Sequence, residues 1–236
     1  MFTKITLENF RSFDHIELDL TEKGNTAKHL AILYGENGAG KSNLMSAFVL
    51  LPELTRTMDA RAAYERILAQ GAIFQDENME KEMREHIRQR LRDMSAIIKD
   101  YQMADCENPI IAEYEFNIDG NNGCYRVEFG QDEILHERLE YVLNRRRGLY
   151  FDCSATGINI NDSIIEKEQG KEFLADVKEM AKRYWGKHSL LAILIYEMKD
   201  KSNSFGRDNI TENFNAVLNE FRNLSCTVSM GDKSWE

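Results

Sequence analysis

The residues with the clearest chemistry lie between Gly35 and Ser42, where the sequence reads GENGAGKS. This segment fits the P-loop pattern G-x-x-x-x-G-K-[ST], with Gly35, Gly40, Lys41 and Ser42 in register. Backbone N–H groups can surround a phosphate chain only where the backbone curls closely, and glycines allow this because they have no Cβ atom to clash. Lys41 is then expected to reach the β- and γ-phosphates, and the Ser42 hydroxyl to bind Mg²⁺. The sequence therefore predicts a cradle for a nucleotide phosphate chain.

A strand before this loop and a helix after it must position it. The apolar run from His29 to Tyr34 predicts the strand, and residues 43–51, which Pro52 is expected to halt, predict the helix. The helix would direct its positive N-terminal end at the bound anion. The positions expected to contact the nucleotide are Gly35, Glu36, Asn37, Gly38, Ala39, Gly40, Lys41, Ser42 and Asn43.

Two further strands are expected before this unit. Apolar residues alternate with polar ones around Ile5 and Leu7, and again from Ile16 to Leu20. The residues from Asn9 to Asp14 would join the two strands. The predicted order at the start of the chain is thus three strands, the loop and a helix.

These segments together carry a family resemblance. The opening ITLENFRSF, followed later by LYGENGAGKSNLMSAF, resembles the start of ABC-type ATPases of the RecF and SMC group. It is especially similar to AAA-family ATPases of bacterial defence systems of the overcoming-lysogenization-defect (OLD) type. The resemblance implies an α/β P-loop NTPase fold, with an ABC-type ATP-binding lobe of mixed and antiparallel sheets plus a helical lid region. It also implies ATP and Mg²⁺ as cofactors, and a role in DNA repair or antiphage defence.

Within the N-F-R-S segment, the resemblance makes Arg11 a candidate neighbour of the phosphates or the ribose. An ordinary surface arginine is the alternative for this position.

The rest of the chain predicts helices and an antiparallel sheet. Residues 52–105 contain helical patterns that fit either a lid or the stub of a coiled-coil arm. Alternating apolar and polar residues over about 110–154 predict an antiparallel sheet, beginning with a hairpin. We therefore expect an ATP-binding lobe over residues 1–160 and a helical subdomain over 161–236 that leads into a C-terminal half.

The groups that would hydrolyse ATP are not evident. The class needs an apolar strand ending in Asp-Glu and a Ser-Gly signature from a partner lobe. The best strand candidate, Leu190–Glu197, has Tyr196 in place of the metal-binding aspartate, and Asp152 lacks a following glutamate. ABC proteins often have a glutamine between their two lobes that senses Mg²⁺. Gln75 and Gln131 are both candidates for that glutamine, and the sequence does not decide between them. The catalytic residues therefore stay unassigned, and we expect hydrolysis only when a C-terminal half, a second protomer or another subunit completes the site.

Three functions stay open at this stage. The first is an ATPase that is active only in the complete or assembled protein, and the second is a regulatory subunit that binds nucleotide without hydrolysing it. The third is a small P-loop kinase. The one dense basic cluster, Arg145, Arg146 and Arg147, fits either contact with a nucleic-acid backbone or a solvated hairpin tip.

Composition and charge narrow the possible partners. The 236 residues carry a net charge of −10, which argues against a surface that coats nucleic acid generally. The N-terminus is charged and has no apolar core of a signal peptide. The apolar run from Leu190 to Tyr196 is far shorter than the ~20 residues of a membrane span. We therefore expect a cytoplasmic protein without a membrane partner.

Overall fold

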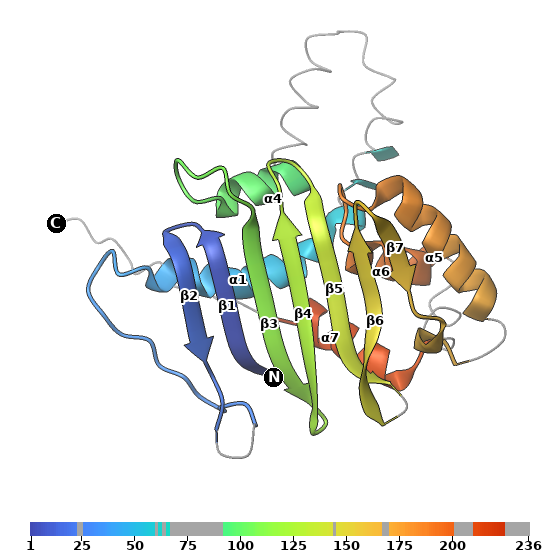
Figure 1. The fold of residues 1–236 in the computed structure, drawn as a ribbon, viewed down its shortest axis with the longest axis horizontal. Helices are drawn as coiled ribbons and strands as arrows, with labels where there is room; N and C mark the ends of the chain where they lie inside the picture. The colour runs from blue at the N-terminus through green and yellow to red at the C-terminus, as the bar shows by residue number, and fades with distance from the viewer. Residues whose placement is uncertain are drawn as a thin grey trace, which may run out of the picture.

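The computed structural model shows one sheet with helices packed against one of its faces (Figure 1). In the described part of the chain, seven strands follow the order β2-β1-β3-β4-β5-β6-β7, and every neighbouring pair is antiparallel. The structure describes residues 1–22, 26–59, 61–62, 65–66, 92–143, 145–166, 170–200 and 210–224. The α/β fold predicted from the sequence is confirmed.

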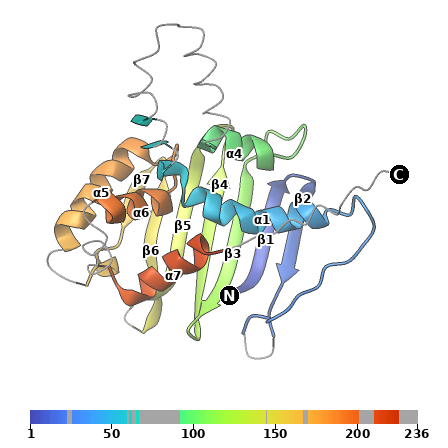
Figure 2. The same cartoon turned by 180° about the vertical axis from the view of Figure 1, so that it is seen from behind.

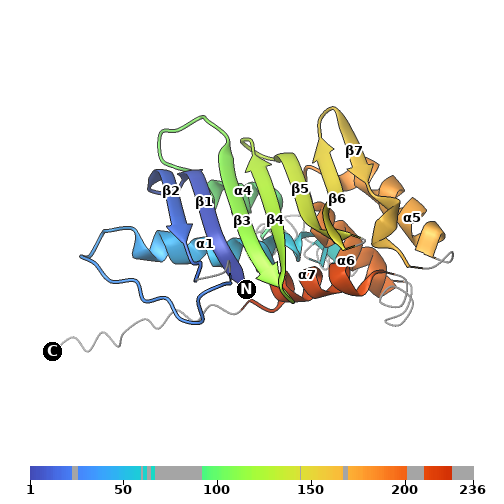
Figure 3. The same cartoon turned by 60° about the horizontal axis from the view of Figure 1, so that its bottom comes forward.

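The strands arise from the period-two alternation of apolar and polar side chains. In β3, for example, Ala112, Tyr114 and Phe116 are buried while the residues between them are partly exposed. No helix of the described residues covers the opposite face of the sheet (Figure 3). The strands are β1 (Phe2–Phe10), β2 (Phe13–Asp19), β3 (Ile110–Ile118), β4 (Asn121–Phe129), β5 (Ile134–Leu143), β6 (Arg146–Ser154) and β7 (Gly157–Ile160).

The helices pack their apolar sides onto the covered face of the sheet (Figure 2). They are α1 (Lys41–Leu54), α4 (Met94–Tyr101), α5 (Gly170–Tyr184), α6 (Leu190–Asp200) and α7 (Glu212–Arg222), with a short 3₁₀ turn η1 (Asp162–Ile164). No helix in the described ranges has the length and apolar character needed to cross a membrane.

Helix α1 runs across the covered face and extends beyond its predicted end (Figure 2). The expectation that Pro52 halts it is wrong, because Pro52 lies inside the last turn and the helix ends at Leu54. A proline so close to the C-terminus removes a single helical hydrogen bond, and burial of its ring in the core offsets that loss. Residues 67–91 of the predicted helical insertion lie outside the described residues, and Gln75 lies among them.

Ser189 joins the end of α1 to the beginning of α6. Its hydroxyl accepts a hydrogen bond from the Ala192 backbone N–H at 3.0 Å, which caps α6. The same hydroxyl donates to the Leu54 carbonyl oxygen at 2.8 Å. The carboxyl end of α1 is thereby fixed against the start of α6.

The sheet and the C-terminal helices share one hydrophobic core. The Phe221 ring of α7 lies 5.5 Å from Phe116, 5.4 Å from Tyr125 and 6.1 Å from Phe2, measured between ring centroids. These rings belong to strands β3, β4 and β1. A domain boundary near residue 160 stays a prediction, and the aromatic packing argues for a single folding unit across it.

Glu137 is a fully buried carboxyl group at the start of α6. It accepts hydrogen bonds from the Leu190 backbone N–H at 2.7 Å, the Trp185 indole N–H at 3.0 Å and the Tyr125 hydroxyl at 3.0 Å. Burial nevertheless raises the pKa of Glu137 to about 7, because these three hydrogen bonds only partly replace the lost hydration. The group therefore changes its charge near neutral pH.

We expect the Glu137→Gln variant to lose part of the pH dependence of stability. The pKa of Glu137 in the folded state, about 7, exceeds its ordinary value of 4.5. The stability it contributes is therefore fully present below pH 4.5 and is lost as the pH rises through 7, by about 3 kcal/mol in all. Urea unfolding of both proteins at several pH values measures the difference between the two curves. Other groups, such as buried His188, affect both curves alike, so parallel curves would contradict this assignment.

Candidate nucleotide-binding site

The loop from Gly35 to Gly40 leads directly into α1. Gly38 and Gly40 have φ angles of +87° and +83°, in the left-handed region that glycine adopts without strain. Gly40 is the N-cap of α1, and no side chain caps the helix there. The first turn of α1 therefore presents backbone N–H groups and a positive dipole end toward the loop, as an anion site requires.

Lys41 lies back along the loop that precedes it. Its ammonium group donates to the Gly35 carbonyl oxygen at 2.7 Å and to the Glu36 carbonyl oxygen at 2.6 Å. The Ser42 side chain, one residue further along α1, is exposed. The charged group and the hydroxyl thus lie at the same end of the helix as the uncapped N–H groups.

The turn between β1 and β2 lies against the first turn of α1. The Asn43 side-chain amide donates to the Ser12 hydroxyl at 2.8 Å. The Arg11 guanidinium donates to the Asn43 side-chain oxygen at 3.5 Å, a long hydrogen bond. The fold therefore brings Arg11 beside the first turn of α1, and its place next to a bound nucleotide stays a prediction.

Gly40 also permits a close approach of Phe13 from β2. A Cβ atom at Gly40 would lie 2.8 Å from Cζ and 2.9 Å from Cε1 of the Phe13 ring. Such distances are well inside van der Waals contact, so any side chain here would push the ring or the loop away. Glycine is required at this position both by the backbone angle and by the space.

We expect Gly40→Ala to destabilise the protein more than Gly38→Ala. Both variants place alanine at a positive φ, which costs about 1–2 kcal/mol. Only the Gly40 variant adds a clash with Phe13, since nothing lies within 4 Å of a Cβ at Gly38. Urea unfolding measures both losses, and we expect roughly 1 kcal/mol or more between them. Equal losses would show that the approach of Phe13 imposes no constraint.

Comparison with known protein families identifies the family of this chain. A model of the AAA ATPase domain matches residues 1–226. The chain belongs to the AAA ATPase domain family. It is also 41% identical over 49 residues to the DNA replication and repair protein RecF of Bacillus mycoides (strain KBAB4). That match covers 21% of this chain and 12% of the RecF protein.

Membership of the AAA ATPase domain family confirms the predicted resemblance to P-loop ATPases, and the RecF match supports the RecF-like part of it. Membership of this family implies the use of a nucleotide. Two segments expected to matter for the ATPase nevertheless differ from their predicted form.

The first is the apolar run from His29 to Tyr34. The predicted strand is wrong, since these residues belong to no strand in the described structure. A strand forms only when a neighbour accepts and donates its backbone hydrogen bonds, and no described strand pairs with this run. Its side chains are accordingly exposed, by 75% for Leu30, 74% for Ile32 and 92% for Tyr34. On its other side, Ala31 and Leu33 line an apolar cavity of about 380 Å³ beside α1.

The second difference concerns the candidates for an Asp-Glu strand in this ATPase domain. Leu190–Glu197, the best candidate for such a strand, forms helix α6 instead. Its run of apolar side chains fits a helix buried in the core just as well. Asp152 lies in β6 and bonds to His136 at 2.7 Å and Arg138 at 2.8 Å on β5. Its strand is four places from β1 in the sheet order, so Asp152 is not beside the loop.

The basic cluster of Arg145, Arg146 and Arg147 is not a single solvated hairpin tip. Arg145 occupies the turn with a positive φ of 67°, whereas Arg146 and Arg147 are the first residues of β6. Arg147 donates to the Glu140 carboxylate at 2.7 Å on the open face of the sheet. The predicted solvated tip therefore keeps only part of its charge for other contacts. Gln131 lies exposed in the loop between β4 and β5, at the opposite end of β5 from this turn.

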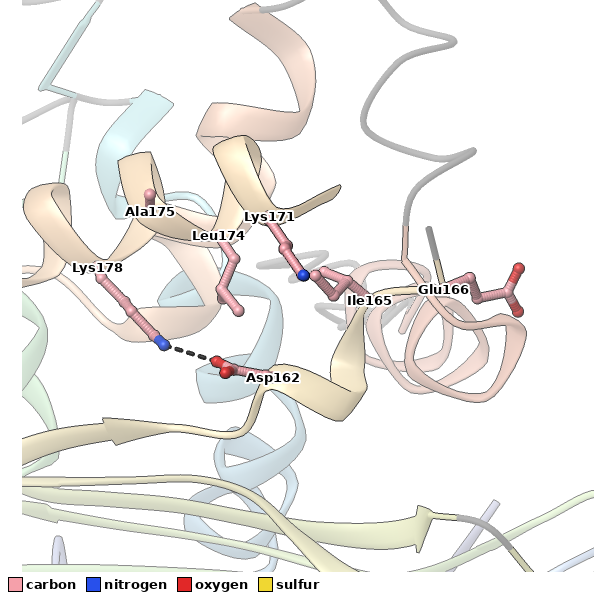
Figure 4. A pocket seen from close by; sticks show the side chains of 7 residues that line it. All are labelled: Asp162, Ile165, Glu166, Lys171, Leu174, Ala175 and Lys178. Atoms are coloured by element: carbon pink, nitrogen blue, oxygen red, sulfur yellow. Dashed lines mark hydrogen bonds and ion pairs between the residues drawn. The ribbon is translucent and has the colours of Figure 1, made fainter. Parts of the chain in front are cut away.

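A second cavity lies apart from the loop, between η1 and α5 (Figure 4). It has a volume of about 420 Å³, and Asp162, Lys171 and Lys178 lie on its wall. Lys178 donates to Asp162 at 2.7 Å, so its charge is paired within the wall. We assign no nucleotide to this cavity.

Sequence reasoning missed the neighbours that hold the loop and Arg11 in place. Phe13 contacts Gly40, and Tyr101 of α4 lies under the Arg11 guanidinium. Tyr101 is far from the loop in sequence and stands among the apolar residues of an amphipathic helix. No local pattern distinguishes it from an ordinary core residue.

Proposed function

We propose that this chain is the nucleotide-binding part of a cytoplasmic ATPase and that Mg-ATP binds at the Gly35–Ser42 loop. The observation that carries the proposal is the uncapped N-terminus of α1, preceded by two left-handed glycines and followed at once by Lys41. ATP is favoured over GTP because the sequence contains no N-K-x-D guanine-recognition motif.

The residues present fit such a ligand. Lys41 now donates to two neutral carbonyl oxygens, and a phosphate would give it stronger, charge-assisted hydrogen bonds. Ser42 would supply a hydroxyl ligand for the Mg²⁺ that accompanies the nucleotide. Arg11 and Asn43 would border the site on the side of the β1–β2 turn. Bound Mg-ATP supplies the phosphoanhydride bond, and these residues bind and orient it.

Thermal unfolding with and without Mg-ATP tests this proposal. A ligand that binds only the folded state stabilises it by about 2.7 kcal/mol at one hundred times its Kd. We therefore expect a rise in Tm of several degrees with Mg-ATP and none with adenosine, which lacks phosphates. An identical Tm in both ligands and in buffer would reject the loop as a phosphate site.

We further propose that a C-terminal half, a second protomer or another subunit completes the site for hydrolysis. Two features support this. The described residues contain no strand ending in Asp-Glu beside the loop. The apolar run from His29 to Tyr34 is also exposed, and no described strand pairs with its backbone, so a further strand can add there.

A second candidate is a regulatory subunit that binds ATP without hydrolysing it. That the described residues contain no Asp-Glu strand beside the loop favours this reading as well, since binding needs only the loop. Phosphate release separates the two functions. Turnover that appears when the chain is mixed with the product of its neighbouring gene supports the ATPase, whereas nucleotide binding without turnover in any mixture supports the regulator.

We place this activity in DNA repair or antiphage defence. The support is the local similarity to RecF, whose name describes DNA replication and repair, together with the resemblance to defence ATPases. The net charge of −10 disfavours contact between nucleic acid and a wide area of the protein surface. Gel-shift titration with duplex DNA in the presence of Mg-ATP tests whether the assembled protein binds DNA.

A further inference from the structure

We propose that Tyr101 is a positioning residue that holds the Arg11 guanidinium at the nucleotide site. The proposal rests on the function proposed above and assigns a role to helix α4. The observation behind it is that Tyr101 holds Arg11 through both its backbone and its ring.

Arg11 contacts Tyr101 in two ways. The Arg11 backbone N–H donates to the Tyr101 carbonyl oxygen at 2.8 Å, which fixes the turn where Arg11 has a positive φ of 53°. The guanidinium carbon lies 5.0 Å from the centroid of the Tyr101 ring, within range of a cation–π interaction. Both the main chain and the charged group of Arg11 are thus held by one residue.

The ring holds the guanidinium without consuming its donors. An aromatic ring attracts a cation through its quadrupole, whereas a carboxylate would pair with the N–H groups and neutralise the charge. In the described structure, the Arg11 Nε atom is buried and has no hydrogen-bond partner. Among the described residues, the guanidinium makes one hydrogen bond, the long one to Asn43. Arg11 therefore keeps its charge and most of its donors for an anionic or hydroxyl ligand.

Tyr101 is itself rigidly placed. Its side chain is 2% exposed, and its ring stacks on Phe10 with centroids 5.1 Å apart and planes 24° apart. Its hydroxyl donates to a Glu53 carboxylate oxygen at 2.9 Å. Burial raises the pKa of Glu53, while the positive charge of Arg92 opposes that shift. Tyr101 thus has little freedom to leave Arg11.

Arg92 and Glu53 connect this cluster to the ends of two helices. Arg92, just before α4, bonds to Glu53 in the last turn of α1 and to Asp100 at 2.5 Å near the end of α4. Helix α1 therefore contacts the nucleotide loop at its start and supports Tyr101 at its end. Arg11 contacts both Asn43 at the start of α1 and Tyr101 of α4. Helix α4 can therefore set the position of Arg11 although the two are distant in sequence.

Calorimetric Mg-ATP affinities of four variants test the proposal. We expect Arg11→Ala and Tyr101→Leu each to weaken binding by roughly 5- to 30-fold, the range of a desolvated cation–π contact. The double variant should bind no more weakly than Arg11→Ala alone. Tyr101→Phe keeps the ring and loses only the hydroxyl, so it should bind within about twofold of the wild type.

A fluorinated ring, whose quadrupole is reversed, shows whether Tyr101 acts through its attraction for the Arg11 cation or only through its packing. Pentafluorophenylalanine at position 101 has nearly the shape of phenylalanine, so it should fold even if Tyr101→Leu does not. Relative to Tyr101→Phe, we expect it to weaken Mg-ATP binding several-fold when Arg11 is present, and not at all when Arg11 is alanine. Equal affinities of the fluorinated and Phe variants, or additive losses in the double variant, would overturn the proposal.

The outcomes also distinguish this proposal from the proposed function. If the folded wild type binds no Mg-ATP, the nucleotide function itself is wrong. If the wild type binds and depends on Lys41, while Arg11→Ala and Tyr101→Leu bind as tightly as the wild type, only the role of Tyr101 is overturned.

Discussion

Replacing Lys41 by alanine is expected to weaken Mg-ATP binding by about 30-fold or more. Lys41 carries the one positive charge at the start of α1, and its ammonium group already spans the loop to Gly35 and Glu36. A hydrogen bond to a charged group contributes about 1.5–3 kcal/mol, and its removal leaves the phosphate oxygens without that partner. Titration calorimetry measures the change in Kd.

The matched control removes the same charge elsewhere. Lys187 is exposed in the segment between α5 and α6, so Lys187→Ala changes the net charge equally without altering the loop. We expect Lys187→Ala to bind as the wild type does and both variants to unfold at similar temperatures. Equal affinities of the Lys41 and Lys187 variants would show that the loop does not hold the phosphates.

Phe221→Ala is expected to destabilise the whole described unit by about 3–5 kcal/mol, as deletion of a buried aromatic ring does in a close-packed core. Phe221 is fully buried and packs its ring against Phe2, Phe116 and Tyr125 from three different strands. The cavity left behind would lie between α7 and the sheet. Urea unfolding followed by circular dichroism measures the loss.

This variant also tests whether the C-terminal helices form a separate subdomain. Asn219 lies exposed on the same helix, and Asn219→Ala should change stability by less than about 0.5 kcal/mol. We expect Phe221→Ala to shift a single cooperative transition. Two transitions, of which only the smaller one moves, would instead support a boundary near residue 160.

The sequence predicts the antiparallel strands well because each has one buried and one open face. In β3 and β4 the alternation is unbroken, and the turn at Asp119 and Gly120 uses two positive φ angles, a conformation that Asp and Gly readily adopt. The loop is recognised from the sequence alone because its glycines, lysine and serine match the P-loop pattern. The approach of Phe13 to Gly40 could not be predicted, because it depends on the tertiary fold.

The failures have a shared physical cause in long-range contacts. The run from His29 to Tyr34 has the composition of a buried strand, but composition cannot supply the neighbour that a strand needs. The segment from Leu190 to Glu197 is apolar all round, a pattern that fits a buried helix as well as a buried strand. The contact of Tyr101 with Arg11 joins residues that only the tertiary fold brings together.

Calorimetric titration of the wild-type chain with Mg-ATP tests the central claim most directly. We expect saturable binding of one nucleotide per chain, weakened when EDTA removes the Mg²⁺ and absent when adenosine replaces ATP. The absence of saturable heat at millimolar Mg-ATP, from protein that still unfolds cooperatively, would contradict the assignment of Gly35–Ser42 as a nucleotide site.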